Sequence, residues 1–243
     1  MHLLLCNSSD FPGIWAFEAL RGGGLPSLEL ITSETLARCS DWEHRVGLDG
    51  VRVSFRLPDG RLVEDGQIAG VLNRLMMPPQ ELISQAVPED RDYAQQEMTA
   101  LYLSWLHGLS CPVLNRPTPQ GLSGRWRHAS EWALAADEAG FAVPVYEQTE
   151  SDLPELGYAT FAPPDVPVAR VIILDGEVFG GYVPPAVRHC CLKLAEICET
   201  RLLGIDLLST LKGRWSFATA TPLPDLQIGG HRLVAALARA LKN

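Results

Sequence analysis

The opening residues constrain the fold most strongly. The apolar run from His2 to Cys6 has the character of a buried strand, and a polar turn over residues 7–10 follows it. A helix is predicted from Pro12 to Leu20, ending at the three glycines 22–24. A buried strand that leads directly into a helix is the first unit of an α/β fold. The chain is therefore expected to belong to the α/β class.

The rest of the first half continues this pattern. Its predicted elements are a strand over 28–32, a hairpin of 51–57 with 61–64, a strand over 68–75, a helix over 92–109 and a strand over 111–114. The hairpin is indicated by the turn Pro58-Asp59-Gly60. A loop rich in proline and glycine over 118–124 then suggests a boundary, which gives domains 1–120 and 121–243.

The second half predicts a mixture of helices and antiparallel strands. The predicted elements are a helix over 125–139 before Gly140, a strand over 143–147, a loop over 151–167, a hairpin of 169–174 with 177–183, a helix over 185–203, a strand pair across Lys212-Gly213 and a helix over 230–241. The strongest local signal is Asp175-Gly176, a pair typical of two-residue hairpin turns. This half is expected to be an α+β domain.

Composition excludes several classes of function. The chain of 243 residues carries a formal net charge of −9 with no basic cluster, so nucleic acid is not an expected partner. No apolar stretch approaches the roughly 20 residues that span a bilayer, and no signal peptide is evident. A cytoplasmic protein without a membrane partner is expected.

The six cysteines form no C-x-x-C pair and are expected to be reduced. Cys191 and Cys198 lie on one apolar face of a predicted helix, as buried thiols do. No G-x-S-x-G, H-E-x-x-H or Walker pattern is present. Neither a hydrolase nor a P-loop enzyme is indicated.

Five segments, taken in order, resemble ATP-grasp ligases, and in particular the branch of the ribosomal-protein glutamate ligases and microviridin ligases. They are GVLNRLMMPP (70–79), LYLSWLHGLSCPVLNRPTPQ (101–120), GFAVPVYEQT (140–149), ARVIILDGEVFGGYV (169–183) and LLGIDLLSTLKGRWSFATATPLPDL (202–226). The resemblance implies a Rossmann-like N-terminal pre-ATP-grasp domain over 1–120, followed by a truncated ATP-grasp-like α+β domain over 121–243.

The resemblance also implies site residues. Arg170 matches a phosphate-side arginine, Asp206 matches a metal ligand, and Arg74 and Asn115 fall in motifs that bind ligands. Three of these residues have a structural alternative: Arg170 as half of a surface ion pair, and Asp206 and Asn115 as turn residues. Trp126 and Trp132, six residues apart, do not share a helix face, so at least one is expected to be exposed.

The sequence departs from the family pattern at positions that bind the metal and the nucleotide phosphates in the family. Thr219 and Thr221 stand where the family has Glu and Asn as ligands of Mg²⁺, and neutral hydroxyls replace them poorly. The family's lysine before Gly140 falls near Ala129, and the segment between residues 149 and 170 is short and has no lysine. The nucleotide site is therefore expected to be degenerate.

Three functional hypotheses remain. The first is a non-catalytic protein without a cofactor, which binds a peptide or small molecule and pairs with a second copy or with a partner ligase. The second is an active ATP-dependent carboxylate–amine ligase that uses ATP and Mg²⁺, with Glu147 or Glu177 converging on Asp206. The third is a structural protein that only mediates assembly.

Overall fold

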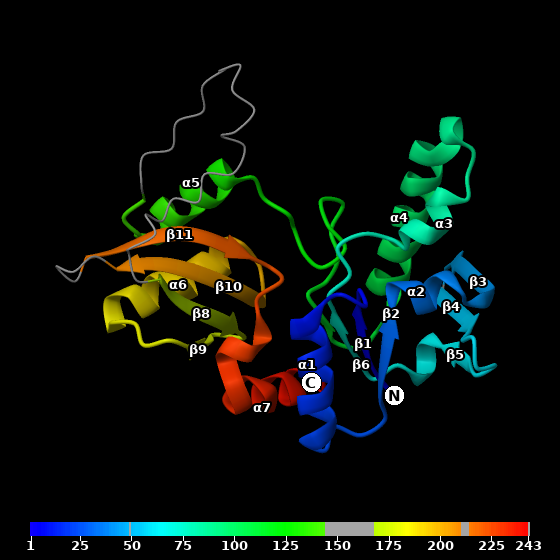
Figure 1. The fold of residues 1–243 in the computed structure, drawn as a ribbon, viewed down its shortest axis with the longest axis horizontal. Helices are drawn as coiled ribbons and strands as arrows, with labels where there is room; N and C mark the ends of the chain where they lie inside the picture. The colour runs from blue at the N-terminus through cyan, green and yellow to red at the C-terminus, as the bar shows by residue number, and fades with distance from the viewer. Residues whose placement is uncertain (49, 144–167, 210–213, 243) are drawn as a thin grey trace. The chain divides into compact units, whose positions relative to one another are not determined.

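A computed structural model describes residues 1–48, 50–143, 168–209 and 214–242 (Figure 1). The chain divides into two compact units. Unit 1 contains Met1–Trp126 and Asp225–Asn243, and unit 2 contains Arg127–Pro224. The first crossing lies close to the predicted boundary at residue 120. The C-terminal segment differs from the prediction, because α7 (Gly230–Ala240) packs against α1 (Phe11–Gly22) and so joins unit 1.

Unit 1 is built around a parallel sheet of four strands in the order β2-β1-β6-β7. These strands are β1 (His2–Cys6), β2 (Leu28–Thr32), β6 (Gly70–Asn73) and β7 (Val113–Leu114). The chain first adds β2 on one side of β1 and later adds β6 on the other. The carboxyl ends of β1 and β6 therefore meet at the point where the strand order reverses, a common location for ligand sites in α/β sheets.

A second sheet in unit 1 is antiparallel, in the order β3-β4-β5. Its strands are β3 (Ser40–Gly47), β4 (Gly50–Arg56) and β5 (Leu62–Glu64). The helix α4 (Arg91–Gly108) contacts β4 through an aromatic cluster of Trp42, Phe55, Tyr102 and Trp105, with the centroids of Trp42 and Phe55 4.4 Å apart. The predicted hairpin of β4 and β5 is confirmed.

Unit 2 contains one antiparallel sheet in the order β11-β10-β8-β9. Its strands are β8 (Val168–Leu174), β9 (Glu177–Gly180), β10 (Leu202–Ser209) and β11 (Trp215–Thr221). The helices α5 (Ala129–Ala139) and α6 (Pro185–Ile197) share a core with alternate strand residues, including Val171, Ile205 and Ala220. Both helices therefore cover the same face of the sheet.

Local details of unit 2 follow the sequence closely. Asp175 and Gly176 have φ of 47° and 80°, as the predicted tight turn requires. Helix α5 begins at Ala129 rather than at residue 125, because His128 caps it in a capping box with Glu131. Helix α6 ends at Ile197, earlier than predicted, because Leu202 and Leu203 belong to β10.

Further predictions concern the burial of cysteine and tryptophan side chains and the presence of membrane-spanning helices. Cys191 and Cys198 are buried as predicted, and burial raises the pKa of Cys191 to about 12. Trp132 is buried and Trp126 is 58% exposed, which confirms the expectation for this pair. None of the helices in the described part of the chain has the length and apolarity of a membrane span.

Several short elements complete the structure. They are α2 (Ser33–Ala37), α3 (Gln80–Ser84) and the 3₁₀ turns η1 (Asp65–Gln67), η2 (Pro88–Asp90) and η4 (Leu226–Gly229). The predicted strand over 143–147 and loop over 151–167 lie almost entirely outside the described residues.

Candidate functional site

In unit 2, Arg170 and Asp206 lie side by side on neighbouring strands. The register pairs Asp206 on β10 with Arg170 on β8 and with Thr219 on β11. The guanidinium Nε of Arg170 is 3.5 Å from Oδ2 of Asp206. Because strand side chains alternate, and the neighbouring residues Val171 and Ile205 belong to the helix-covered core, this row lies on the other face of the sheet.

The environment of Asp206 works against its charge. Partial burial raises the pKa of this carboxyl group, and the nearby Arg170 guanidinium lowers it by a smaller amount. The ion pair with Arg170 alone would lower the pKa of Asp206. Loss of water therefore outweighs the pairing with Arg170, whose side chain is 56% exposed and screened by solvent.

We expect Asp206→Asn to stabilise the protein at neutral pH. The raised pKa means that the folded state holds the Asp206 proton more tightly than the unfolded state. That contribution is fully present below the unfolded pKa, roughly 4, and is lost as pH rises through the folded pKa. Urea unfolding at pH 7 should show a gain for the variant that disappears on acidification.

Asp175→Asn is the matched control for that prediction. It breaks an exposed ion pair in the same unit, in which Nε of Arg201 is 2.7 Å from Oδ1 of Asp175. We expect it to give no stability gain at pH 7. A lower stability of Asp206→Asn at pH 7 would mean that the ion pair with Arg170 outweighs burial, which contradicts the prediction.

Thr219 and Thr221, where the resemblance places metal ligands, lie close to Asp206 in the sheet. Thr219 is its register partner, and Thr221 is opposite Gly204, two residues along the same face. The hydroxyl of Thr221 accepts a hydrogen bond from the backbone N–H of Leu223 at 3.1 Å. Within the described sheet, the neighbours of Asp206 on the two adjacent strands are thus a guanidinium and neutral hydroxyls, rather than a second carboxylate.

The carboxylates named for a rearranged metal site do not join Asp206 in the described residues. Glu177 pairs with Leu174, four residues along β8 from Arg170, which corresponds to about 13 Å of strand. Glu147 lies outside the described residues. Across the part of the chain that the structure describes, no group of three His, Cys, Asp or Glu residues is arranged to hold a metal ion.

Arg74 and Asn115 follow β6 and β7 in unit 1. Arg74 is 4% exposed and forms a two-pronged ion pair with Asp10, with Nε to Oδ2 at 2.6 Å and Nη2 to Oδ1 at 3.0 Å. Asp10 also caps α1, since its Oδ1 accepts from the backbone N–H of Gly13 at 3.1 Å. The charge of Arg74 is therefore met by a carboxylate of the chain itself.

Gly13 lies against the Asp10–Arg74 ion pair, and Asn115 follows the strand β7. A side chain at residue 13 would place its Cβ 2.6 Å from Oδ2 of Asp10, so the close approach requires Gly13. Asn115 is 5% exposed, and its backbone carbonyl accepts a hydrogen bond from Nδ2 of Asn73 at 3.2 Å. The sequence did not single out Asp10 or Asn73. The available signals were a capping residue before Pro12 and a polar residue in an apolar strand.

No protein-family model matches the sequence, and no curated protein matches it significantly. Solved structures do match. The macrocyclase MdnC, bound with precursor peptide MdnA from Microcystis aeruginosa MRC, is 13% identical with a TM-score of 0.73, over 100% of each chain. A RiPP-associated ATP-grasp ligase from Chryseobacterium gregarium, in complex with ADP and a leader and core peptide, is 12% identical with a TM-score of 0.66, over 99% of this chain and 96% of the other. The chain has the ATP-grasp fold.

A third structure agrees with this assignment. The macrocyclase MdnB from Microcystis aeruginosa MRC is 14% identical with a TM-score of 0.66, over 99% of this chain and 98% of the other. The resemblance to the ATP-grasp superfamily seen in the sequence is thus confirmed at the level of the fold. At these identities the ATP-grasp fold is shared, while the chemistry has to be argued from the residues themselves.

Proposed function

We propose that this protein is a non-catalytic ATP-grasp-like protein that acts as a binding or partner subunit in a peptide-modification pathway in the cytoplasm. We assign unit 1 to a Rossmann-like pre-ATP-grasp domain, on the basis of its parallel sheet, and unit 2 to a shortened ATP-grasp domain. Arg74, Asn115 and Arg170 remain the proposed ligand-binding residues, and Asp206 remains the proposed metal ligand.

The row of Arg170, Asp206 and Thr219 carries this proposal. Magnesium binds oxygen ligands in a near-octahedral shell and in phosphoryl-transfer sites usually depends on carboxylates. Phosphoryl transfer in turn depends on that metal to neutralise developing charge. Here the carboxylate of Asp206 has a guanidinium 3.5 Å away on one side and a threonine on the other. A cation beside Asp206 would be repelled by Arg170 and would gain no second carboxylate from β11.

The proposed ligand class comes from the matched structures. MdnC is bound with a precursor peptide, and the Chryseobacterium gregarium ligase is in complex with a leader and core peptide. A peptide is therefore the first ligand to test, with a partner ligase or a second copy of this chain as protein partners. The net charge of −9 argues against nucleic acid.

One observation favours the alternative, an active ATP-dependent carboxylate–amine ligase using ATP and Mg²⁺. Burial raises the pKa of the Asp206 carboxyl group, and groups with perturbed pKa values concentrate at functional sites. Under this alternative Asp206 would hold the metal and Arg170 would face the phosphates.

Isothermal titration with ATP or a non-hydrolysable analogue, each with Mg²⁺ at millimolar concentration, separates the two functions. We expect no binding tighter than about 100 μM, or about 5.5 kcal/mol. The matched variant Thr219→Glu/Thr221→Asn restores the family's types of metal ligand beside Asp206. A gain of Mg²⁺-dependent ATP binding in this variant would show that the missing metal ligands prevent binding by the unmodified protein. Tight binding by the unmodified protein that is lost in Asp206→Asn would establish the alternative.

A further inference from the structure

The strand β3 forms the edge of the antiparallel sheet in unit 1. It is eight residues long, and no strand in the described part of the chain pairs with its outer side. In an antiparallel ladder the backbone groups of alternate residues point away from the paired strand. An exposed edge of this length offers N–H and C=O groups to another strand, and proteins usually block such edges or use them for pairing.

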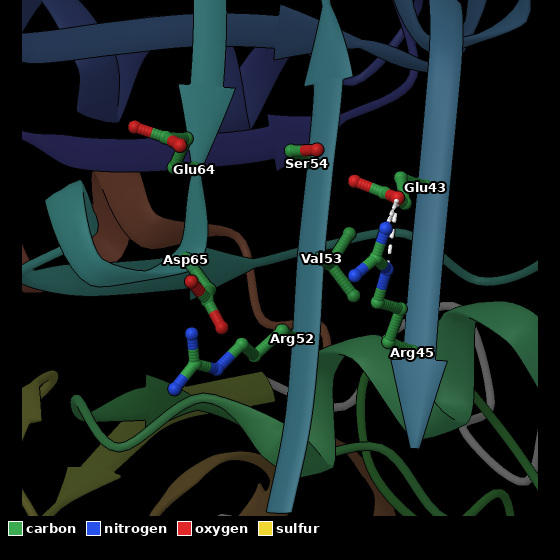
Figure 2. A pocket seen from close by; sticks show the side chains of 7 residues that line it. All are labelled: Glu43, Arg45, Arg52, Val53, Ser54, Glu64 and Asp65. Carbon is green, nitrogen blue, oxygen red and sulfur yellow. Dashed lines mark hydrogen bonds and ion pairs between the residues drawn. The ribbon is translucent and has the colours of Figure 1, made fainter. Parts of the chain in front are cut away.

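Charged side chains of both signs line one face of this sheet. Figure 2 shows the side chains around a hollow of about 250 Å³, which includes Glu43 and Arg45 of β3 and Arg52 of β4. Arg45 and Arg52 are direct register partners, so two like charges lie side by side. Arg45 forms an ion pair with Glu43, and Arg52 has no ion pair within the described residues. Glu64 and Asp65 also line the hollow, so the charges of both signs are exposed here, and on β3 itself they are Glu43 and Arg45.

An apolar side chain on β3 is also uncovered. Val46 is 69% exposed, although it shares the inner face of the strand with Trp42, which stacks on Phe55. The helix α4 covers the Trp42 end of this face through Tyr102 and Trp105. The Val46 end is left in contact with solvent.

We propose that β3 pairs antiparallel with β3 of a second copy of this chain, about a two-fold axis at His44. In that register Glu43 lies opposite the partner's Arg45, and Arg45 lies opposite the partner's Glu43. Val46 lies opposite the partner's Trp42, which is a favourable pairing of a β-branched with an aromatic side chain. Because the axis repeats every contact, the sequence Glu43-His44-Arg45 is complementary to itself, and a continuous six-stranded sheet results.

Sedimentation equilibrium of the full chain tests this interface. We expect the unmodified protein to dimerise. Glu43→Arg and Arg45→Glu should each raise the dimer dissociation constant at least tenfold, or about 1.4 kcal/mol, because each places like charges opposite one another. The double variant Glu43→Arg/Arg45→Glu should dimerise again, and an equal mixture of the two single variants should form a heterodimer. Arg201→Glu, an exposed reversal in unit 2, should leave dimerisation unchanged.

Three results would overturn the proposal: a monomer at about 100 μM, a dimer indifferent to both single reversals, or single variants that stay apart when mixed. Thermal midpoints equal to that of the unmodified protein distinguish lost pairing from lost folding. Should a single variant unfold, recovery of the dimer by the double variant decides the question. An extended foreign peptide on this edge would instead bind the monomer and leave the mixed variants separate.

Discussion

Replacement of Arg74 by methionine is expected to lower the free energy of unfolding by about 3–5 kcal/mol. Methionine keeps much of the volume of arginine but removes the guanidinium from Asp10, whose side chain is 15% exposed. The carboxylate then remains largely out of water with its main counter-charge gone. Two hydrogen bonds, at 2.6 and 3.0 Å, are lost together. Such a loss is large because the remaining charge is uncompensated.

Arg56→Met is the matched control for this prediction. Arg56 pairs with Asp41 at 2.8 Å, but their side chains are 42% and 63% exposed. Exposed pairs contribute only about 0–1 kcal/mol, so the control should change stability little. Urea unfolding of both variants gives the comparison.

A double-mutant cycle tests the cause. Asp10→Asn keeps an N-cap for α1 while removing the charge. If the ion pair is responsible, Arg74→Met/Asp10→Asn should lose clearly less than the sum of the two single losses. Additive effects, or a loss under about 1 kcal/mol for Arg74→Met, would show that the pair does not hold this edge of the sheet.

This ion pair also shows how far the sequence could specify the site. The sequence predicts the strands β1 and β6, and the structure pairs them in parallel, so the residues that follow them lie at the same edge of the sheet. The resemblance pointed to Arg74 as a ligand-binding residue. That its charge meets Asp10, 64 positions away, could not be read from local patterns, because tertiary packing alone brings the two together.

The fold was predictable where periodicity was strong and missed where it was not. The buried strands β1 and β6 and the Asp175-Gly176 turn follow directly from apolar runs and turn residues. The strand β3 was missed because Asp41, Glu43 and Arg45 make it look like a loop, although its inner face carries Trp42. Its role as a strand is set by pairing with β4 and by the packing of Trp42 against Trp105 of α4, and the second of these contacts joins distant parts of the sequence.

Replacement of Trp105 by alanine is expected to lower the free energy of unfolding by about 3–5 kcal/mol. Trp105 is 1% exposed, and its ring centroid is 5.3 Å from that of Phe55 and 5.7 Å from those of Trp42 and Tyr102. Alanine removes the group that joins α4 to the antiparallel sheet and leaves a cavity. Urea unfolding measures the loss. Trp126→Ala is the control, since Trp126 is 58% exposed and its removal should change stability by no more than about 0.5 kcal/mol.

Trp105→Phe separates packing from hydrogen bonding in this cluster. The indole Nε1 of Trp105 is buried and has no hydrogen-bond partner among the described residues. A buried donor without a partner costs about 1–3 kcal/mol, so phenylalanine loses contacts but also removes that penalty. We expect Trp105→Phe to be considerably less destabilising than Trp105→Ala. Equal losses would indicate that Nε1 donates to a bound water, and that the cluster is held by a polar contact as well as by ring packing.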